Sequence, residues 1–361
     1  MTEPASARLM IDLDALAHNL AALRAEAMGA EVAPVLKSDA YGLGAAAVGR
    51  RLWAEGARSI FVARLAEGEA LRAALGSDRP ATIHVLDGLT DGAEARFQAA
   101  ELTPVLSSLG QIAAAQQAGL PWPVAINIDT GMSRQGLTLE EARAAVQAID
   151  RLRGLRIGLV MSHLGSAAEP ENPRNARQLA AFLEARSLFP NARASLSASA
   201  GIFLGADYRF DLVRPGISLF GGGPRETPDE RLRAMATLTA PILDLRNLRP
   251  GDVVGYGEAV RIAAPTRVAV VGAGYTDGVI RAARDGGYAW FAGARRRLLI
   301  VNMDILVIEL GDTPAALGDP VELLGPNAAL DDLAAAGGTV AHEVLVRLSR
   351  RAERVYIGEA Q

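Results

Sequence analysis

A lysine at position 37 closes an apolar run and is followed at once by a glycine-rich stretch. The segment VLKSDAYGLG, residues 35–44, places Lys37 at the end of a run typical of a buried strand, with Tyr41 four residues later. A lysine just past a strand is usually a solvated surface residue. A neutral lysine amine is also a nucleophile that forms Schiff bases with carbonyl compounds, so the residues around Lys37 decide between the two interpretations.

Other apolar runs also end in polar groups that suit anion binding. Arg134 follows the run VAINID, while His163 and Ser199 end the runs RIGLVMSH and RASLSAS. The last run, DLVRPGISLF, itself carries Arg214, Gly216 and Ile217. A hydroxyl and glycine-flanked amides suit a phosphate ester at the loops after the last two strands of a barrel. Carboxylates at the run ends are few, which disfavours a metal-dependent hydrolase. A site for a phosphate, a lysine that can form a Schiff base and an arginine that can face a ring nitrogen together fit the cofactor pyridoxal phosphate (PLP).

The elements that must position these groups repeat in a regular order. From residue 31 to about 221, eight β-branched runs alternate with alanine-rich segments of helical spacing. This count predicts a (β/α)8 TIM-like barrel over residues 8–235, with a doubly wound sheet as the alternative. From residue 236 to 361, β-rich runs separated by Gly and Pro turns predict a mostly antiparallel β domain. Residues 1–12 can add a strand to it.

Composition narrows the class of protein further. The chain has 361 residues, a net charge of −4 with both signs interspersed, and no cysteine. These features argue against a nucleic-acid or anionic-membrane surface, and they exclude a thiolate nucleophile and a disulfide framework. The first ten residues lack an apolar signal core, and no apolar run is long enough to span a membrane. We therefore expect a cytoplasmic protein with no membrane partner.

Several segments in a fixed order resemble the alanine racemase family. They include VLKSDAYGLGA, NIDTGMSRQG, VVGYGEAV, GAGYTDG and VNMD, together with the segment that contains Ser199 and Arg214. Members of the family are PLP enzymes that interconvert L- and D-alanine. The resemblance implies that Lys37 holds PLP as a Schiff base and serves as the base on the D-alanine face. Tyr256 would be the base on the L-alanine face and would come from the partner subunit, so a homodimer with shared active sites is implied.

The same resemblance assigns roles to the remaining groups. Arg214 would contact the pyridine nitrogen, with His163 behind it, while Arg134 would steady the PLP phenolic oxygen and the substrate carboxylate. The phosphate would be held by Tyr41, Ser199 and the amides of Gly216 and Ile217. On the substrate side, Met303 would contact the carboxylate through its backbone, Tyr275 would narrow the entrance and Asp304 would border it. No metal is implied.

Two departures from the family pattern leave questions open. Asn127 stands where some members carry a carbamylated lysine that orients the arginine corresponding to Arg134, and Arg350 stands where some carry a tyrosine. A broad-specificity amino-acid racemase and a non-catalytic PLP-binding protein remain alternatives, although the second class lacks the β domain. Fold-related decarboxylases usually use a cysteine, which this chain lacks. The expected role is to supply D-alanine for peptidoglycan, with a catabolic role left open.

Overall fold

The computed structural model describes residues 7–148 and 152–358, which pack as two compact units. The first, here called the parallel unit, is Ala17–Leu219, and the second, the antiparallel unit, comprises the chain before Ala17 and after Leu219. The domain limits 8–235 and 236–361 stay predictions. Each unit is described separately below.

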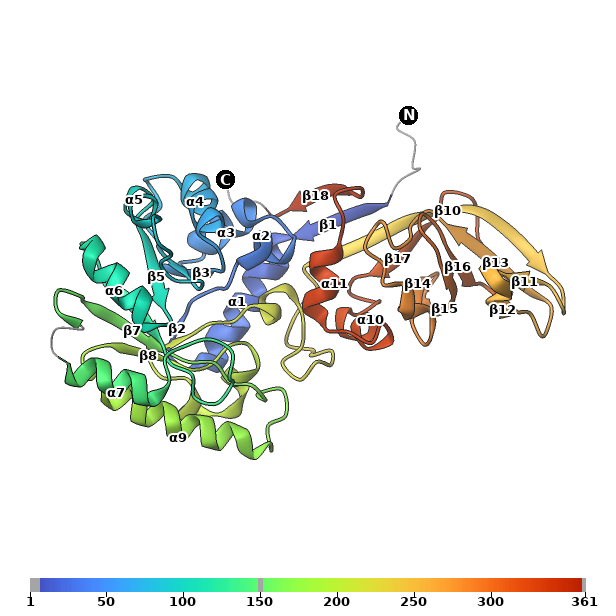
Figure 1. Ribbon diagram of the computed structural model, residues 1–361. Coiled ribbons are helices and arrows are strands. Elements are labelled where there is room, and N and C mark those ends of the chain that lie inside the picture. Colours follow the sequence, from blue (N-terminus) through green and yellow to red (C-terminus); the bar gives the residue numbers. More distant parts are fainter. Residues whose placement is uncertain (1–6, 149–151, 359–361) are drawn as a thin grey trace. The chain divides into compact units, whose positions relative to one another are not determined.

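The parallel unit is built on strands that pair in chain order. Six of them form one sheet: β3 (Ser59–Val62), β4 (Thr82–Val85), β5 (Leu102–Leu106), β6 (Val124–Asn127), β7 (Ile157–Met161) and β8 (Arg193–Ser195). A second parallel pair joins β2 (Glu31–Val32) to β9 (Leu212–Val213). The sheet curls into a partial TIM-like barrel (Figure 1). A doubly wound sheet reverses its strand order at a switch point, whereas this order runs without reversal.

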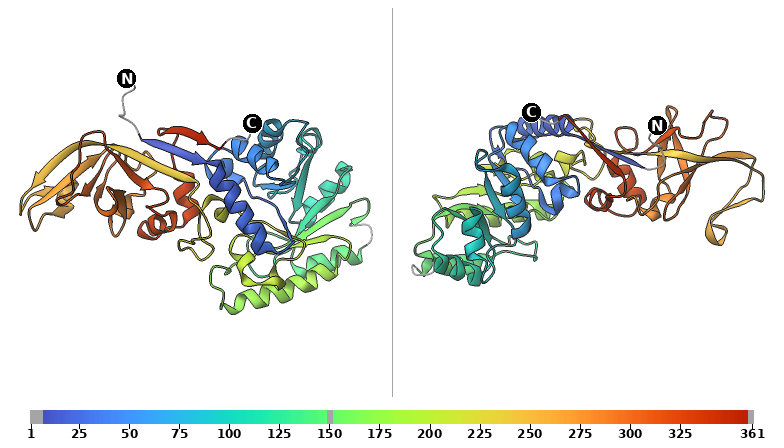
Figure 2. Two further views of the ribbon diagram at one scale, coloured as in Figure 1. Left: turned by 180° about the vertical axis from the view of Figure 1, so that it is seen from behind. Right: turned by 90° about the horizontal axis from the view of Figure 1, so that it is seen from above.

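Helices lie around the outside of the curled sheet (Figures 1 and 2). They are α1 (Leu13–Ala27), α3 (Ala45–Ala54), α4 (Leu65–Leu75), α5 (Glu94–Ala99), α6 (Leu109–Ala118), α7 (Leu139–Gln147) and α9 (Pro173–Ser187). Side-chain caps fix where some of them begin: the Thr138 hydroxyl accepts from the amide of Glu141 at the start of α7. The stretch LTLEEARAAVQAIDRLRG, residues 137–154, has helical spacing throughout, but its residues 149–151 lie outside the described residues.

Apolar side chains on one face of the parallel strands fill the interior of the curl. They are Ala33, Phe61, Val105, Ala125, Leu159, Met161 and Leu212, all less than 5% exposed. Successive residues of a strand point to opposite faces, so one set packs inside while the other meets the helices. Because the strands are parallel, all their carboxyl ends lie at one end of the curl and all their amino ends at the other.

The antiparallel unit is organised by one long strand. β10 (Ala236–Leu248) pairs with β17 (Pro320–Leu324) and β1 (Arg8–Asp12) along its first part and with β13 (Thr266–Val271) along the rest. The other strands of this sheet are β14 (Tyr288–Phe291), β15 (Ala294–Val301), β16 (Leu306–Glu309) and β18 (Glu353–Ile357). All pairs are antiparallel except β1 with β18. A separate hairpin, β11 (Val253–Val254) and β12 (Val260–Arg261), and two short helices, α10 (Leu330–Ala336) and α11 (Ala341–Arg347), complete the unit.

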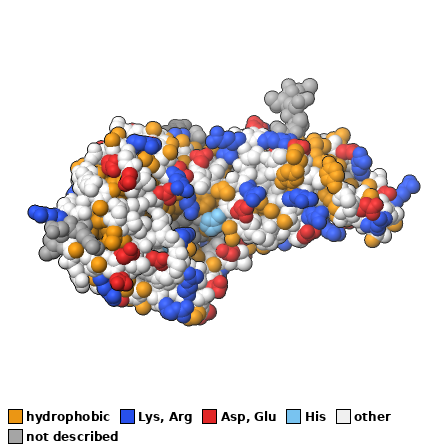
Figure 3. All heavy atoms as spheres, viewed as in Figure 1, with side chains coloured by type: hydrophobic (Ala, Val, Ile, Leu, Met, Phe, Trp, Pro, Cys, Tyr) orange, Lys and Arg blue, Asp and Glu red, His pale blue; other side chains and the backbone are white. Residues whose placement is uncertain are grey.

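The surface and its charges agree with the composition. Figure 3 shows acidic and basic side chains interspersed over the face in view. Within residues 7–148 and 152–358, no helix has both the length and the hydropathy needed to cross a membrane. The same residues contain no group of three or more histidine, aspartate or glutamate side chains placed to bind a metal ion.

Candidate active site

Lys37 begins a turn with unusual backbone geometry at the carboxyl end of the first parallel run. The next four residues, Ser38 to Tyr41, all adopt left-handed helical angles with φ between 53° and 57°. Each such non-glycine residue costs about 1–2 kcal/mol, so the surrounding contacts must offset that cost. The Ser38 amide donates to the Glu67 carboxylate at 2.8 Å, the Gly42 amide donates to the Ser38 carbonyl at 2.7 Å, and Tyr41 is only 4% exposed. The turn fixes Lys37 and Tyr41 relative to each other.

The electrostatic surroundings of Lys37 favour its neutral amine. Burial lowers the pKa of Lys37, the positive charge of Arg134 lowers it further, and Glu67 opposes both effects. The Arg134 side chain makes no hydrogen bond or ion pair with any described residue, so its charge is not cancelled by a bound carboxylate. A neutral amine is the form that acts as a nucleophile or a base.

The loop that carries Arg134 is held by two side chains from the end of β6. Asp129 accepts hydrogen bonds from the amides of Gly131 and Met132 at 2.8 Å. Burial would raise the pKa of Asp129, but four backbone amides of this loop together lower it, so it is a firm anionic anchor. Asn127 donates through Nδ2 to the carbonyl of Gln135 at 2.9 Å. The asparagine therefore ties down the residue next to Arg134 and does not contact the guanidinium itself.

Arg214 is a buried cation bound by neutral groups. It is 3% exposed, and its terminal nitrogens donate to the carbonyls of Ser195 and Ser162 and to the Ser195 hydroxyl. Its Nε makes no hydrogen bond, and the whole side chain makes no ion pair, with any residue in the described part of the chain. Burial lowers the pKa of Arg214 to about 9, so it stays a cation at neutral pH with two of its five N–H donors, one of them on Nε, still to satisfy.

A compact cradle forms where the loops after β8 and β9 meet the left-handed turn. The Ser199 hydroxyl accepts from the Gly216 amide at 3.0 Å and from the Ser218 amide at 3.3 Å. A Cβ on Gly216 would lie 2.2 Å from the Tyr41 hydroxyl, so only glycine allows this approach. The Ser218 hydroxyl is fully buried and has no hydrogen-bond partner among the described residues. Hydroxyls, amides and an orphaned buried donor fit a phosphate group.

His163 and Ile217 lie at the same end of the parallel unit. His163 comes two residues after β7, and its carbonyl accepts from the Gln178 side chain at 2.9 Å. The preceding residue, Ser162, supplies the carbonyl that binds Arg214. Ile217 begins the short 3-10 helix Ile217–Phe220 directly after Gly216 and is 7% exposed. All predicted residues of this unit therefore gather at the carboxyl ends of its strands.

In the antiparallel unit, Tyr256 lies in the connection of the β11–β12 hairpin. Val254 and Val260 flank it and pack against the apolar cluster of Val268, Leu299, Ile300 and Val307. A Cβ on the preceding Gly255 would lie 2.8 Å from Ile300. The hairpin is thus fixed on β15, while the Tyr256 side chain is 87% exposed within this chain.

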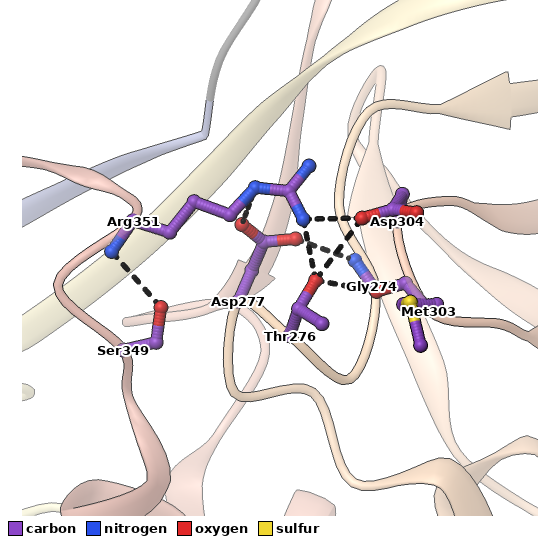
Figure 4. Close-up of polar contacts among 7 residues, drawn as sticks. All are labelled: Gly274, Thr276, Asp277, Met303, Asp304, Ser349 and Arg351. Carbon is purple, nitrogen blue, oxygen red and sulfur yellow. Dashed lines mark hydrogen bonds and ion pairs between the residues drawn. The ribbon is translucent and has the colours of Figure 1, made fainter.

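Met303 and Asp304 lie on a loop beside the loop that carries Thr276 and Asp277, and Arg351 contacts both loops (Figure 4). Tyr275 directly precedes Thr276 in the chain. The Tyr275 amide donates to the Asn302 carbonyl at 2.9 Å, and the Thr276 hydroxyl donates to the Met303 carbonyl at 2.6 Å. Arg351 contacts Thr276, Asp277 and Asp304, and these four residues are called the arginine cluster below.

Arg351 connects the two loops directly. It donates to the Thr276 hydroxyl at 2.6 Å, pairs with the Asp304 carboxylate and lies 3.5 Å from the carboxylate of buried Asp277. The Met303 side chain is 52% exposed and its amide makes no hydrogen bond to a described residue. The cluster therefore orders the backbone around Met303 and leaves that amide available to an anion.

Sequence reasoning overlooked several of these positioning residues. Ser218, Thr276, Asp277 and Arg351 were not predicted, because nothing in their local patterns marks a contact made over a long sequence separation. One sequence signal was available for the central residue, since Lys37 is the only lysine among the 361 residues.

Comparison with known proteins matches the whole chain to one family. Residues 11–224 match the model described as "Alanine racemase, N-terminal domain", and residues 235–356 match "Alanine racemase, C-terminal domain". The chain is 40% identical to a catabolic alanine racemase of Agrobacterium fabrum, over 98% of this chain and 92% of that one. It is also 40% identical to an alanine racemase of a Methylobacterium species, over 99% of both. A solved alanine racemase from Bartonella henselae with covalently bound pyridoxal phosphate superposes with a TM-score of 0.91 at 32% identity, covering 98% of this chain and 100% of that one.

Proposed function

This chain belongs to the alanine racemase family, and on that basis we propose that it interconverts L- and D-alanine with pyridoxal phosphate as its cofactor. The observation that carries the proposal is the position of Lys37. Its amine has a lowered pKa and lies at the end of the parallel unit where Arg214 and the cradle of Tyr41, Ser199 and Gly216 also lie.

The residues of the parallel unit fit this cofactor. Lys37 would hold it through Nζ, Arg214 would donate from Nε to the ring nitrogen, and the cradle would hold the phosphate. The proposal adds Ser218 to the phosphate ligands, because its buried hydroxyl has no partner among the described residues. When bound, pyridoxal phosphate supplies an electron sink that stabilises the carbanion left after alanine loses its α-proton.

Racemisation needs one proton acceptor on each face of the α-carbon. We assign Lys37 Nζ to the D-alanine face and Tyr256 Oη to the L-alanine face. The lowered pKa of Lys37 increases the share of neutral amine that can accept a proton. Arg134 and the Met303 amide would bind the substrate carboxylate, and Tyr275 and Asp304 would border the entrance. His163 would support Arg214 from behind.

Three structural proposals accompany the function. We propose that β2 to β9 close into a complete (β/α)8 barrel, supported by the bridges Val35–Phe61 and Ala198–Arg214 between the two parallel sheets. We propose a homodimer in which each active site combines Lys37 of one chain with Tyr256 of the partner subunit, supported by the 87% exposure of Tyr256 in the single chain. We propose a cytoplasmic location and a role in supplying D-alanine for peptidoglycan.

The sole lysine gives a direct test of the cofactor and the reaction. The purified protein should be yellow, and borohydride reduction should leave a pyridoxyl group on the peptide containing Lys37, identified by mass spectrometry. The matched variant Lys37→Ala should show neither the visible absorption of lysine-bound cofactor nor racemisation of L-alanine by chiral chromatography. Full activity in Lys37→Ala would overturn the proposal.

Subunit mixing tests the shared site separately. Lys37→Ala and Tyr256→Phe chains are each expected to be inactive, but their hybrid dimer contains one site with both wild-type residues. Partial recovery of racemisation after exchange supports the shared site, and no recovery despite verified exchange contradicts it. A screen of the other common amino acids distinguishes an alanine racemase from a broad-specificity racemase.

A further inference from the structure

The parallel unit contains a cavity at the end opposite the candidate active site. Its volume is about 630 Å³, and it is lined from the amino ends of the parallel strands, including the first residues of β3, β8 and β9, which are Ser59, Arg193 and Leu212. Cavities of this size hold small organic molecules in many proteins. Since the proposed catalytic residues of this unit follow the carboxyl ends of the same strands, the cavity is separate from them.

The inner wall of the cavity carries an unsatisfied polar ring. His84 is 7% exposed, and its ring makes no hydrogen bond to a described residue. Its Nδ1 is closed off from solvent, so Nε2 is the ring nitrogen that a ligand in the cavity can reach. Its ring stacks on Phe61 with centroids 4.3 Å apart and planes 12° apart. Burial and the charges of Arg214 and Arg193 lower the pKa of His84 to about 3, so the imidazole is neutral. Leaving a buried imidazole without a hydrogen-bond partner costs free energy, so a ligand that supplies a hydrogen bond to this ring is favoured.

Guanidinium groups line the rim of the cavity. Arg58, Arg72 and Arg193 all contribute to the lining, against one acidic side chain, Glu101. Arg72 donates to three backbone carbonyls and Arg58 to two, and neither of them forms an ion pair with a described carboxylate. Arg193 pairs with Glu31 at 2.7 Å. The excess of positive charge at the rim therefore favours an anion.

The walls between the rim and His84 are largely apolar. Trp122 contributes a large flat surface, and its indole nitrogen is already satisfied by the Leu102 carbonyl at 3.0 Å. Leu159 and Leu212 contribute aliphatic surface. The lining therefore combines guanidinium groups, apolar surface and uncharged polar groups, which are the His84 ring and the hydroxyls of Ser59, Thr82 and Thr103.

We propose that this cavity binds a small organic carboxylate, with its carboxylate at the arginine rim, its apolar body against Trp122 and a polar atom hydrogen-bonded to His84. Together, these three features suit an acid that has an apolar body and a second polar atom. The inference is independent of alanine racemisation, because no residue assigned to that reaction lines the cavity.

Two related acids test the proposal on the PLP-loaded enzyme. 6-Hydroxy-2-naphthoate has a carboxylate and a hydroxyl at opposite ends of an apolar body, and 2-naphthoate lacks the hydroxyl. Binding is measured by isothermal titration calorimetry in saturating racemic alanine, which occupies the active site and gives no net reaction. We expect saturable binding of one molecule per chain, with the hydroxy acid binding more tightly.

Substitutions then locate the bound acid. His84→Phe keeps an aromatic ring on Phe61 and should weaken the hydroxy acid by about 2- to 10-fold while sparing 2-naphthoate. Arg58→Gln should weaken both acids by up to about fivefold. Arg96→Gln is the matched control, because Arg96 pairs with Glu69 on the outer surface and is not among the cavity residues.

Three results would overturn the proposal. They are no saturable binding of either acid at millimolar concentration, binding abolished by alanine, and affinities that both cavity variants leave unchanged. A crystal structure with only water in the cavity at a saturating concentration of the hydroxy acid would have the same meaning. His84→Phe is checked for folding by thermal unfolding, and the exposed Arg58→Gln keeps the test valid if that variant is unstable.

Discussion

Replacing Gly216 by alanine tests whether the Tyr41–Gly216 contact builds the phosphate cradle. The new Cβ would lie 2.2 Å from the Tyr41 hydroxyl oxygen and 3.0 Å from the ring carbon that bears it, well inside the 3.4 Å at which ordinary contact begins. Tyr41 is 4% exposed and sits in the left-handed turn, so it has little room to withdraw. Overpacking of this kind costs about 1–3 kcal/mol. In a protein of this size each kcal/mol lowers the melting temperature by about 2–4 °C.

Stability and cofactor affinity should both fall. Thermal unfolding of the cofactor-free protein, followed by circular dichroism, gives the first, and titration of the visible absorption with pyridoxal phosphate gives the second. Loss of one charge-assisted hydrogen bond to the phosphate corresponds to an affinity decrease on the order of tenfold or more.

A double variant separates the clash from other effects of the new methyl group. Tyr41→Phe removes the oxygen at 2.2 Å, so Gly216→Ala combined with Tyr41→Phe should be more stable than Gly216→Ala alone. The matched control is Gly110→Ala in α6, where a Cβ meets only the Ser108 hydroxyl at 3.8 Å. That change should be neutral or stabilising by about 0.4–1 kcal/mol. Wild-type stability and cofactor affinity in Gly216→Ala would refute the reasoning.

Three further changes examine other parts of the site. Tyr256→Phe should lose racemisation by about 10²- to 10⁴-fold while still exchanging the α-proton of D-alanine in D2O, and equal loss of exchange from both enantiomers by NMR would contradict a face-specific base. Arg134→Gln removes a positive charge that lowers the pKa of Lys37, so the pH midpoint for amine labelling of this single lysine in the cofactor-free protein, read by mass spectrometry, should rise; an unchanged or lower midpoint would contradict that role. Thr276→Val removes the hydroxyl bond to the Met303 carbonyl and should raise KM for alanine several-fold with little change in kcat or in cofactor absorption, whereas a wild-type KM would show that the bond does not position Met303.

Local patterns in the sequence predicted much of the parallel unit. The alternation of β-branched runs with helical spacing located its strands, because a buried parallel strand requires continuous apolar residues and its covering helix requires an amphipathic face. The ends of those runs located Lys37, Arg214 and Gly216. Short helices such as α5 (Glu94–Ala99) were missed, since six residues are too few for a clear helical period.

Long-range contacts and unusual backbone angles could not be predicted in the same way. Non-glycine residues rarely adopt left-handed backbone angles at several successive positions. The residue types from Ser38 to Tyr41 therefore did not predict the turn that positions Lys37. The position of Arg351 depends on carboxylates and a hydroxyl 47 to 75 residues away in the chain. Nothing in the sequence around His84 marks a binding role, and only the surrounding strands reveal that it lines a cavity.

The charges of the candidate site explain why folding and cofactor binding should be coupled. Arg214 is buried with neutral acceptors only, and the lowered pKa values of Arg214 and Lys37 both reflect the cost of desolvating positive charge. Arg134 adds a third cation without a described partner. A phosphate-bearing ligand bound there brings negative charge to groups that lack it. Any ligand that binds only the folded state stabilises that state by RT ln(1 + [L]/Kd). The same unbalanced cations that make the site costly to fold therefore provide its affinity for an anionic cofactor.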